Sequence, residues 1–176
     1  MQKYPDLGVI TLDDDIIYHK SLVQGLLNNR TENPKTIVGY VGKAIVKKEN
    51  QLHMYYREKN AADKNTPSIQ VYLIGWGGIY YPAGSLHEKA FNEDEVRRIV
   101  PGRGSDIWFW AAALANNTNQ ICLGLPKDYN LGVPIPQNDK TKPKDRPKTD
   151  VLLERFQLAI DYFEVREKLI KLLPNK

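Results

Sequence analysis

The chain has 176 residues, of which 41% are hydrophobic and 26% are charged. This size and balance predict one globular domain over residues 1–176 with a core of its own, and they exclude an intrinsically disordered chain. Lysine and arginine number 25 against 21 aspartates and glutamates. The resulting net charge of +4 is too small to indicate nucleic-acid binding by itself.

The first predicted element is an apolar, β-branched run over residues 7–12, which three aspartates follow directly. That pattern is typical of a buried parallel strand whose end emerges at the carboxyl edge of a sheet. Apolar residues at roughly helical spacing then predict a helix over residues 21–29. Two strands are expected next, over residues 36–46 and 53–57. Residues 70–81 are strand-like on both sides of a glycine-rich segment at which the backbone must bend.

A short helix is expected around residues 92–96, and Ser105 is a favourable N-cap for an apolar helix over residues 106–115. A strand over residues 121–125 precedes a proline-rich loop, residues 126–149, which has no periodicity. An amphipathic helix over residues 150–173 ends the chain. Because strands and helices alternate, we expect an α/β fold, in which ligand sites lie where strands end.

The most specific candidate for a functional site is the acidic cluster, which consists of Asp13, Asp14 and Asp15. Hard divalent cations prefer carboxylate oxygens and can bridge a protein to a diphosphate. In an extended segment residues i and i+2 point the same way, so Asp13 and Asp15 could face one ion while Asp14 turns aside. The alternative is a solvated acidic turn that caps the next helix.

The glycine turn, Gly75 to Gly78 with Tyr80 and Tyr81 after it, is a second candidate. Its glycines let a ligand approach the backbone, and the faces of Trp76 and the tyrosines suit sugar rings. The alternative is a bulge in a core strand whose aromatic side chains are simply buried.

Asp106 is a third candidate, because it follows a glycine-containing segment at the start of a predicted helix. A carboxylate there could act as a general base beside a cleft. A helix N-terminus favours the ionised form and lowers its basicity, so the alternative is that Asp106 only helps to cap the helix.

The proline-rich loop holds five cations against two acids between residues 138 and 148. One interpretation is a mobile lid whose lysines, Lys140, Lys142 and Lys144, neutralise phosphates. A solvated linker is the more common meaning of such a run. Its cations have no aromatic residues between them, which argues against nucleic-acid binding.

The histidines, the cysteine and the apolar segments also bear on the class of protein. The three histidines have no zinc-ligand spacing, and Cys122, as the only cysteine, cannot form an internal disulfide. The first six residues lack the apolar run of a signal peptide, and the longest uncharged stretch, residues 107–126, contains an Asn-rich run that is too polar for a bilayer. We therefore expect a cytoplasmic protein without a transmembrane segment.

Taken in order, the segments VITLDDDIIYHKSL, GWGGIYYPAGSLH and GSDIWFWAAALANNT resemble bacterial glycosyltransferases of GT-A type that decorate surface polysaccharide or lipooligosaccharide. The resemblance covers about residues 7–118 and continues more weakly in the last helix. It implies a mixed sheet flanked by helices, a nucleotide-sugar donor and a saccharide acceptor. The chain is then expected to be a metal-dependent glycosyltransferase of polysaccharide biosynthesis.

The resemblance also implies roles for individual residues. Asp13 and Asp15 match the Asp-x-Asp motif and would hold Mn²⁺ or Mg²⁺ against the donor diphosphate. Asp106 matches the acid that, in inverting members, takes the proton from the attacking hydroxyl. Substrate-binding roles fall on residues of the acidic cluster and the glycine turn: Asp14, Trp76, Gly77, Gly78, Tyr80 and Tyr81.

The chain departs from the family at Ser105, where a second acid is usual, and at His19, where proline is usual. In GT-A enzymes the half before the Asp-x-Asp strand supplies the pocket for base and ribose, whereas only 12 residues precede the cluster here. The chain then corresponds to the C-terminal part of such a fold: part of a longer enzyme, a sequence whose start is mis-set, or a remnant that is inactive alone. In each case we expect an exposed sheet edge that favours self-association.

The alternative from another functional class is a non-catalytic carbohydrate-binding or interaction module derived from such an enzyme. Chelation of metal distinguishes the two, because aromatic stacking needs no ion. This module would bind sugar through aromatic side chains: Trp76, Tyr80, Tyr81, Trp108 and Trp110.

Overall fold

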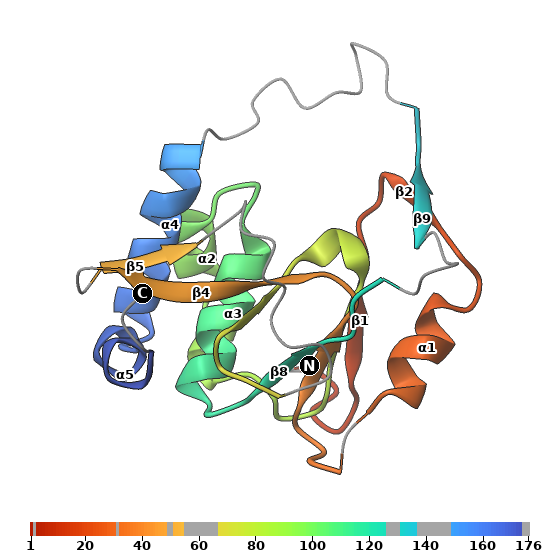
Figure 1. Ribbon diagram of the computed structural model, residues 1–176, viewed down its shortest axis with the longest axis horizontal. Helices are drawn as coiled ribbons and strands as arrows, with labels where there is room; N and C mark the ends of the chain where they lie inside the picture. The colour runs from red at the N-terminus through yellow and green to blue at the C-terminus, as the bar shows by residue number, and fades with distance from the viewer. Residues whose placement is uncertain are drawn as a thin grey trace.

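The computed structural model describes residues 1, 3–30, 32–48, 51–54, 67–125, 131–136 and 149–173. Strands and helices are mixed along them, which is consistent with the expected α/β class (Figure 1). The strands are β1 (Val9–Thr11), β2 (Ile16–Tyr18), β3 (Ile37–Gly39), β4 (Gly42–Lys48), β5 (Gln51–Met54), β6 (Val71–Leu73), β7 (Ile79–Tyr81), β8 (Gln120–Cys122) and β9 (Gly132–Pro134). The helices are α1 (Leu22–Asn28), α2 (Glu93–Ile99), α3 (Ser105–Ala115), α4 (Thr149–Tyr162) and α5 (Arg166–Leu172), with 3₁₀ turns η1 (Gly75–Gly77) and η2 (Glu88–Phe91).

The central sheet is mixed and has the strand order β1-β7-β3-β8. β7 runs antiparallel to β1 and β3, whereas β3 and β8 are parallel. The prediction of a buried parallel strand at β1 is wrong, because β1 is half-buried, pairs antiparallel with β7 and lies at the edge of the described sheet. A β-branched run does not encode the direction of its partner strand. Self-association through this edge stays a prediction.

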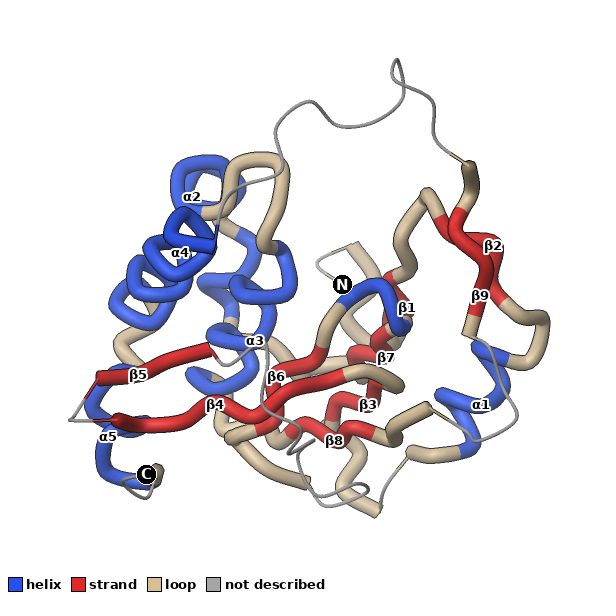
Figure 2. Tube along the Cα trace, turned by 45° about the horizontal axis from the view of Figure 1, so that its top comes forward, coloured by secondary structure: helices blue, strands red, loops and turns tan. Residues whose placement is uncertain are grey.

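The two faces of the central sheet are covered by different helices (Figure 2). Ile37 and Ile79 point to the larger core cluster under α3 and α4, whereas Val38 and Tyr80 belong to a smaller cluster under α1. This alternation follows from the two-residue period of a strand. The acidic cluster follows β1 and therefore lies at the end of a sheet that is packed on both faces.

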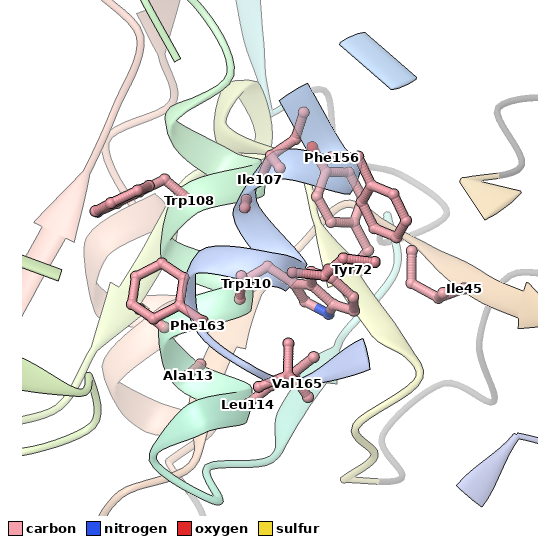
Figure 3. Packing of buried hydrophobic residues seen from close by; sticks show 14 of the residues in the cluster. Ile45, Tyr72, Ile107, Trp108, Trp110, Ala113, Leu114, Phe156, Phe163 and Val165 are labelled. Carbon is pink, nitrogen blue, oxygen red and sulfur yellow. The ribbon is translucent and has the colours of Figure 1, made fainter. Parts of the chain in front are cut away.

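The larger core is built around the two tryptophans of α3, which are fully buried (Figure 3). The Trp110 ring stacks on Phe156 with 5.3 Å between centroids, and the Trp108 ring meets Phe163 edge-on at 4.7 Å. The Trp108 Nε1–H also donates a hydrogen bond of 2.9 Å to the carbonyl of Ala90. The expectation that Trp108 and Trp110 present sugar-binding surfaces is therefore wrong, because both rings are buried in the core and cannot contact a ligand.

Two predicted elements are each divided in the structure. Residues 36–46 form parts of β3 and β4, which belong to different sheets, because Tyr40 packs into the cluster under α1 while Ile45 packs into the larger core. Residues 150–173 form α4 and α5, which are separated at Glu164, where the backbone is left-handed with φ 58°. The break keeps Phe163 and Val165 both buried.

Two local expectations also need correction. Gly104, with φ 103°, occupies the N-cap position of α3 and no side chain caps that helix, so Ser105 is its first residue and not its cap. The strands β2 and β9 were not predicted, because they stabilise each other across the chain and β9 lies inside the expected loop 126–149. Over the described part of the chain, helices are too short or too polar to span a membrane.

Candidate active site

Three segments that are far apart in the sequence meet beyond the carboxyl end of β1. The acidic cluster directly follows β1, the turn η1 connects β6 to β7, and α3 begins with Asp106 in its first turn. The backbone N–H of Gly75 donates a hydrogen bond of 3.0 Å to Oδ2 of Asp106, which joins the turn to the helix. The hydroxyl of Tyr18 joins the same turn to the acidic cluster.

Asp106 is held in a half-buried position against the glycine turn. A Cβ atom at Gly75 would lie 2.7 Å from Oδ1 of Asp106, so only glycine allows this approach. Burial raises the pKa of Asp106 to about 6, and the negative charge of Asp13 raises it too, while the Gly75 hydrogen bond acts in the opposite direction. The expected lowering of its basicity by the helix N-terminus is therefore outweighed by burial.

The acidic cluster concentrates negative charge near Asp106. The pKa of Asp13 is raised, first by desolvation and then by the charges of Asp15 and Asp14, whereas the Arg103 guanidinium opposes the shift. A divalent cation would relieve this repulsion, and carboxylates are the oxygen ligands that Mg²⁺ and Mn²⁺ prefer. The residues thus fit such an ion as a partial ligand set. Among the described side chains no group of three His, Cys, Asp or Glu is arranged to hold a metal ion, so an ion bound at the acidic cluster would need further ligands from water or substrate.

Tyr18 is a site residue that the sequence analysis missed. Its hydroxyl accepts a hydrogen bond of 2.9 Å from the backbone N–H of Asp13 and donates one of 3.1 Å to the carbonyl of Trp76. Arg103 was also missed, although its charge reaches Asp13. The only available signal was position: Tyr18 lies within the first quoted motif segment and Arg103 directly precedes the third, and position does not state a role.

The glycine turn places its aromatic residues differently. Trp76 is 40% exposed and lies on the turn whose backbone contacts Asp106 and Tyr18. Tyr81 is buried, and the pKa of its hydroxyl is raised by burial and by the nearby charge of Asp106. Tyr80 lies on the opposite face of the sheet, where it packs under α1. The structure therefore brings Tyr81 and the backbone of Trp76 to the acids, but not Tyr80.

Of the remaining predicted site residues, some have structural explanations and others lie outside the described residues. A Cβ atom at Gly77 would clash with Val41, and Gly78 adopts a left-handed φ of 78°. Local packing and backbone conformation therefore account for both glycines without a ligand. Asp14 is exposed. The predicted phosphate-binding lysines lie outside the described residues: Lys140, Lys142 and Lys144.

Two cavities adjoin β1, one on each face of the sheet. An apolar one of about 430 Å³ is lined by Val9, Tyr81 and Phe109, among others, and a polar one of about 460 Å³ is lined by Asp6, Arg30 and other residues. Neither is lined by the acidic cluster. The candidate site is therefore defined by its acids and its hydrogen bonds.

Comparison of the chain with protein-family models, with curated proteins and with solved structures finds no match. Inference about function therefore depends on the chemistry of the site itself.

Proposed function

We propose that the chain is a metal-dependent glycosyltransferase domain, which moves a sugar from a nucleotide-sugar donor to a hydroxyl of a saccharide acceptor. The observation that carries this proposal is the meeting of Asp13, Gly75 and Asp106 at the end of β1, joined by the hydrogen bonds of Gly75 and Tyr18. These residues come from the three segments that resemble GT-A enzymes. The mixed sheet, with the acid-bearing strand at its edge, agrees with the C-terminal part of such a fold.

The acids divide into two roles in the proposed reaction. Asp13 and Asp15 would hold Mn²⁺ or Mg²⁺, which would neutralise the charge that develops on the departing nucleoside diphosphate. Asp106 accepts the proton of the acceptor hydroxyl as the new bond to the anomeric carbon forms and the bond to phosphate breaks. A carboxyl with a pKa of about 6 is mostly ionised at neutral pH and is a stronger base than an ordinary aspartate.

Trp76, exposed on the turn that adjoins the acids, would supply the remaining requirement, an aromatic surface on which a sugar ring can stack. A purely aromatic carbohydrate-binding module has weaker support. Two of its five expected aromatic residues, Trp108 and Trp110, are core residues, and stacking gives no role to a half-buried acid with a raised pKa.

Thermal unfolding with Mn²⁺ and a panel of nucleoside diphosphates tests this proposal. A nucleotide at 100 times its Kd should stabilise the protein by about 2.7 kcal/mol, which is roughly 5–10 °C for a domain of this size. The shift should require Mn²⁺ and disappear in the Asp13→Asn/Asp15→Asn variant.

The matched control is Asp6→Asn, which also removes an exposed aspartate charge but at the opposite end of β1. It should keep the full shift. The proposal is contradicted if no nucleotide stabilises the protein with Mn²⁺, or if the double variant is stabilised as much as the unmodified chain.

A further inference from the structure

The strands β2 and β9 form a two-stranded ribbon that holds the acidic cluster by its backbone. In Figures 1 and 2 the ribbon lies on the side of α1, away from α3 to α5. Ile17 pairs with Val133, and beyond the paired strands the N–H of Ile135 donates a hydrogen bond of 2.8 Å to the carbonyl of Asp15. One end of the acidic cluster is thus fixed to β9.

The other end of the cluster is fixed by Tyr18, the last residue of β2. Its hydroxyl accepts the Asp13 N–H at 2.9 Å and donates to the Trp76 carbonyl at 3.1 Å. A tyrosine hydroxyl has one proton to donate, so its donor capacity is fully used by the glycine turn. Because Tyr18 is half-buried, its ring is also restrained by packing.

These bonds form one connected path through the site. The path leads from Asp13 through the Tyr18 hydroxyl to Trp76, and then along one residue of backbone to Gly75, whose N–H holds Asp106. A displacement of the Asp13 backbone on binding a cation therefore changes or strains the contact between Tyr18 and the glycine turn.

We propose that Tyr18 is a positioning residue that couples cation binding at Asp13 and Asp15 to the conformation of the Trp76 turn. This inference rests on the proposed function, since it takes the acidic cluster to be a metal site. Binding of the cation and presentation of the Trp76 face to a sugar are then linked steps, and the hydroxyl of Tyr18 is the link.

The Tyr18→Phe variant tests this coupling, because it keeps the ring and removes only the hydroxyl. The chain has three tryptophans, and Trp108 and Trp110 are buried, so quenching of tryptophan fluorescence by acrylamide reports on Trp76. In the unmodified protein, addition of Mg²⁺ alone should change this quenching. In Tyr18→Phe, Mg²⁺ binding measured by thermal unfolding should be about tenfold weaker, the size of one lost hydrogen bond to a positioned group.

The response of Trp76 separates positioning from a merely structural role. In Tyr18→Phe the quenching change should stay absent even when Mg²⁺ is raised until thermal stabilisation saturates. Tyr4→Phe, which removes a hydroxyl from an exposed tyrosine before β1, should behave like the unmodified protein.

Two results would overturn the coupling. If Tyr18→Phe binds Mg²⁺ and the Trp76 quenching changes as in the unmodified protein, Tyr18 has no positioning role, and the proposed function still stands. If Mg²⁺ raises the unfolding temperature of the unmodified protein without changing its quenching, or changes neither, the coupling is wrong. The proposed function is then decided separately by the nucleotide-dependent shift with Mn²⁺.

Discussion

Replacement of Asp106 by asparagine is expected to slow sugar transfer by about 10²–10⁴-fold, the usual contribution of a general base. Asparagine has nearly the same shape, and its carbonyl oxygen can still accept the Gly75 N–H, so the turn should stay in place. What is lost is the ability to take a proton from the acceptor hydroxyl.

The pH dependence gives this variant a second readout. Because the pKa of Asp106 is raised to about 6, the carboxyl is protonated below that pH and cannot act as a base. Transfer by the unmodified protein should therefore rise with pH through about 6 and then level off, and this rise should be missing in Asp106→Asn. Steady-state rates between pH 5 and 8, with Asp6→Asn as the control, provide the measurement. A rate within a few-fold of the unmodified protein, with the same pH profile, would exclude Asp106 as the base.

Replacement of Trp108 by alanine should have the largest effect on stability. The ring is fully buried, contacts Phe163 and Tyr162, and donates a hydrogen bond to Ala90. Truncation of a buried aromatic side chain leaves a cavity and costs about 3–5 kcal/mol, and here it also leaves the Ala90 carbonyl without its donor. The unfolding temperature should fall by roughly 6–20 °C.

Trp76→Ala is the matched control for this variant, since Trp76 is the exposed tryptophan of the chain. It should change the free energy of unfolding by about 1 kcal/mol or less, yet it should weaken sugar binding. Comparison of the two variants by thermal unfolding distinguishes core tryptophans from the one beside the acids. Equal unfolding temperatures for Trp108→Ala and Trp76→Ala would contradict the packing described for α3.

The sequence predicted those elements whose patterns are local. The helix α3 and the bend at residues 75–78 appear close to the expected positions, because an apolar helical run and a glycine cluster are encoded by neighbouring residues. The division of residues 36–46 between two sheets was not predictable in this way. It depends on which core cluster each half packs against, and that is set by distant helices.

The same distinction applies to the site. Asp13, Asp15 and Asp106 were identified as candidates from their residue types and positions, and the structure gives Asp106 a half-buried setting that a sequence cannot report. Tyr18 was missed because its role depends on two backbone partners, one of which is 58 residues away in the sequence. The prediction that Trp108 and Trp110 bind sugar was wrong, because the residue type alone does not distinguish the exposed Trp76 from these two buried tryptophans.

The central claim is that the acidic cluster and the start of α3 form one site. Its most direct test is the pKa of the Asp106 carboxyl, measured by carbon NMR in the presence of a chelator, in the unmodified protein and in Asp13→Asn. We expect a value near 6 that falls in the variant, because loss of the Asp13 charge removes one cause of the shift, with no change in Asp6→Asn. A pKa close to the ordinary 3.8, or one that is the same in Asp13→Asn, would contradict the account.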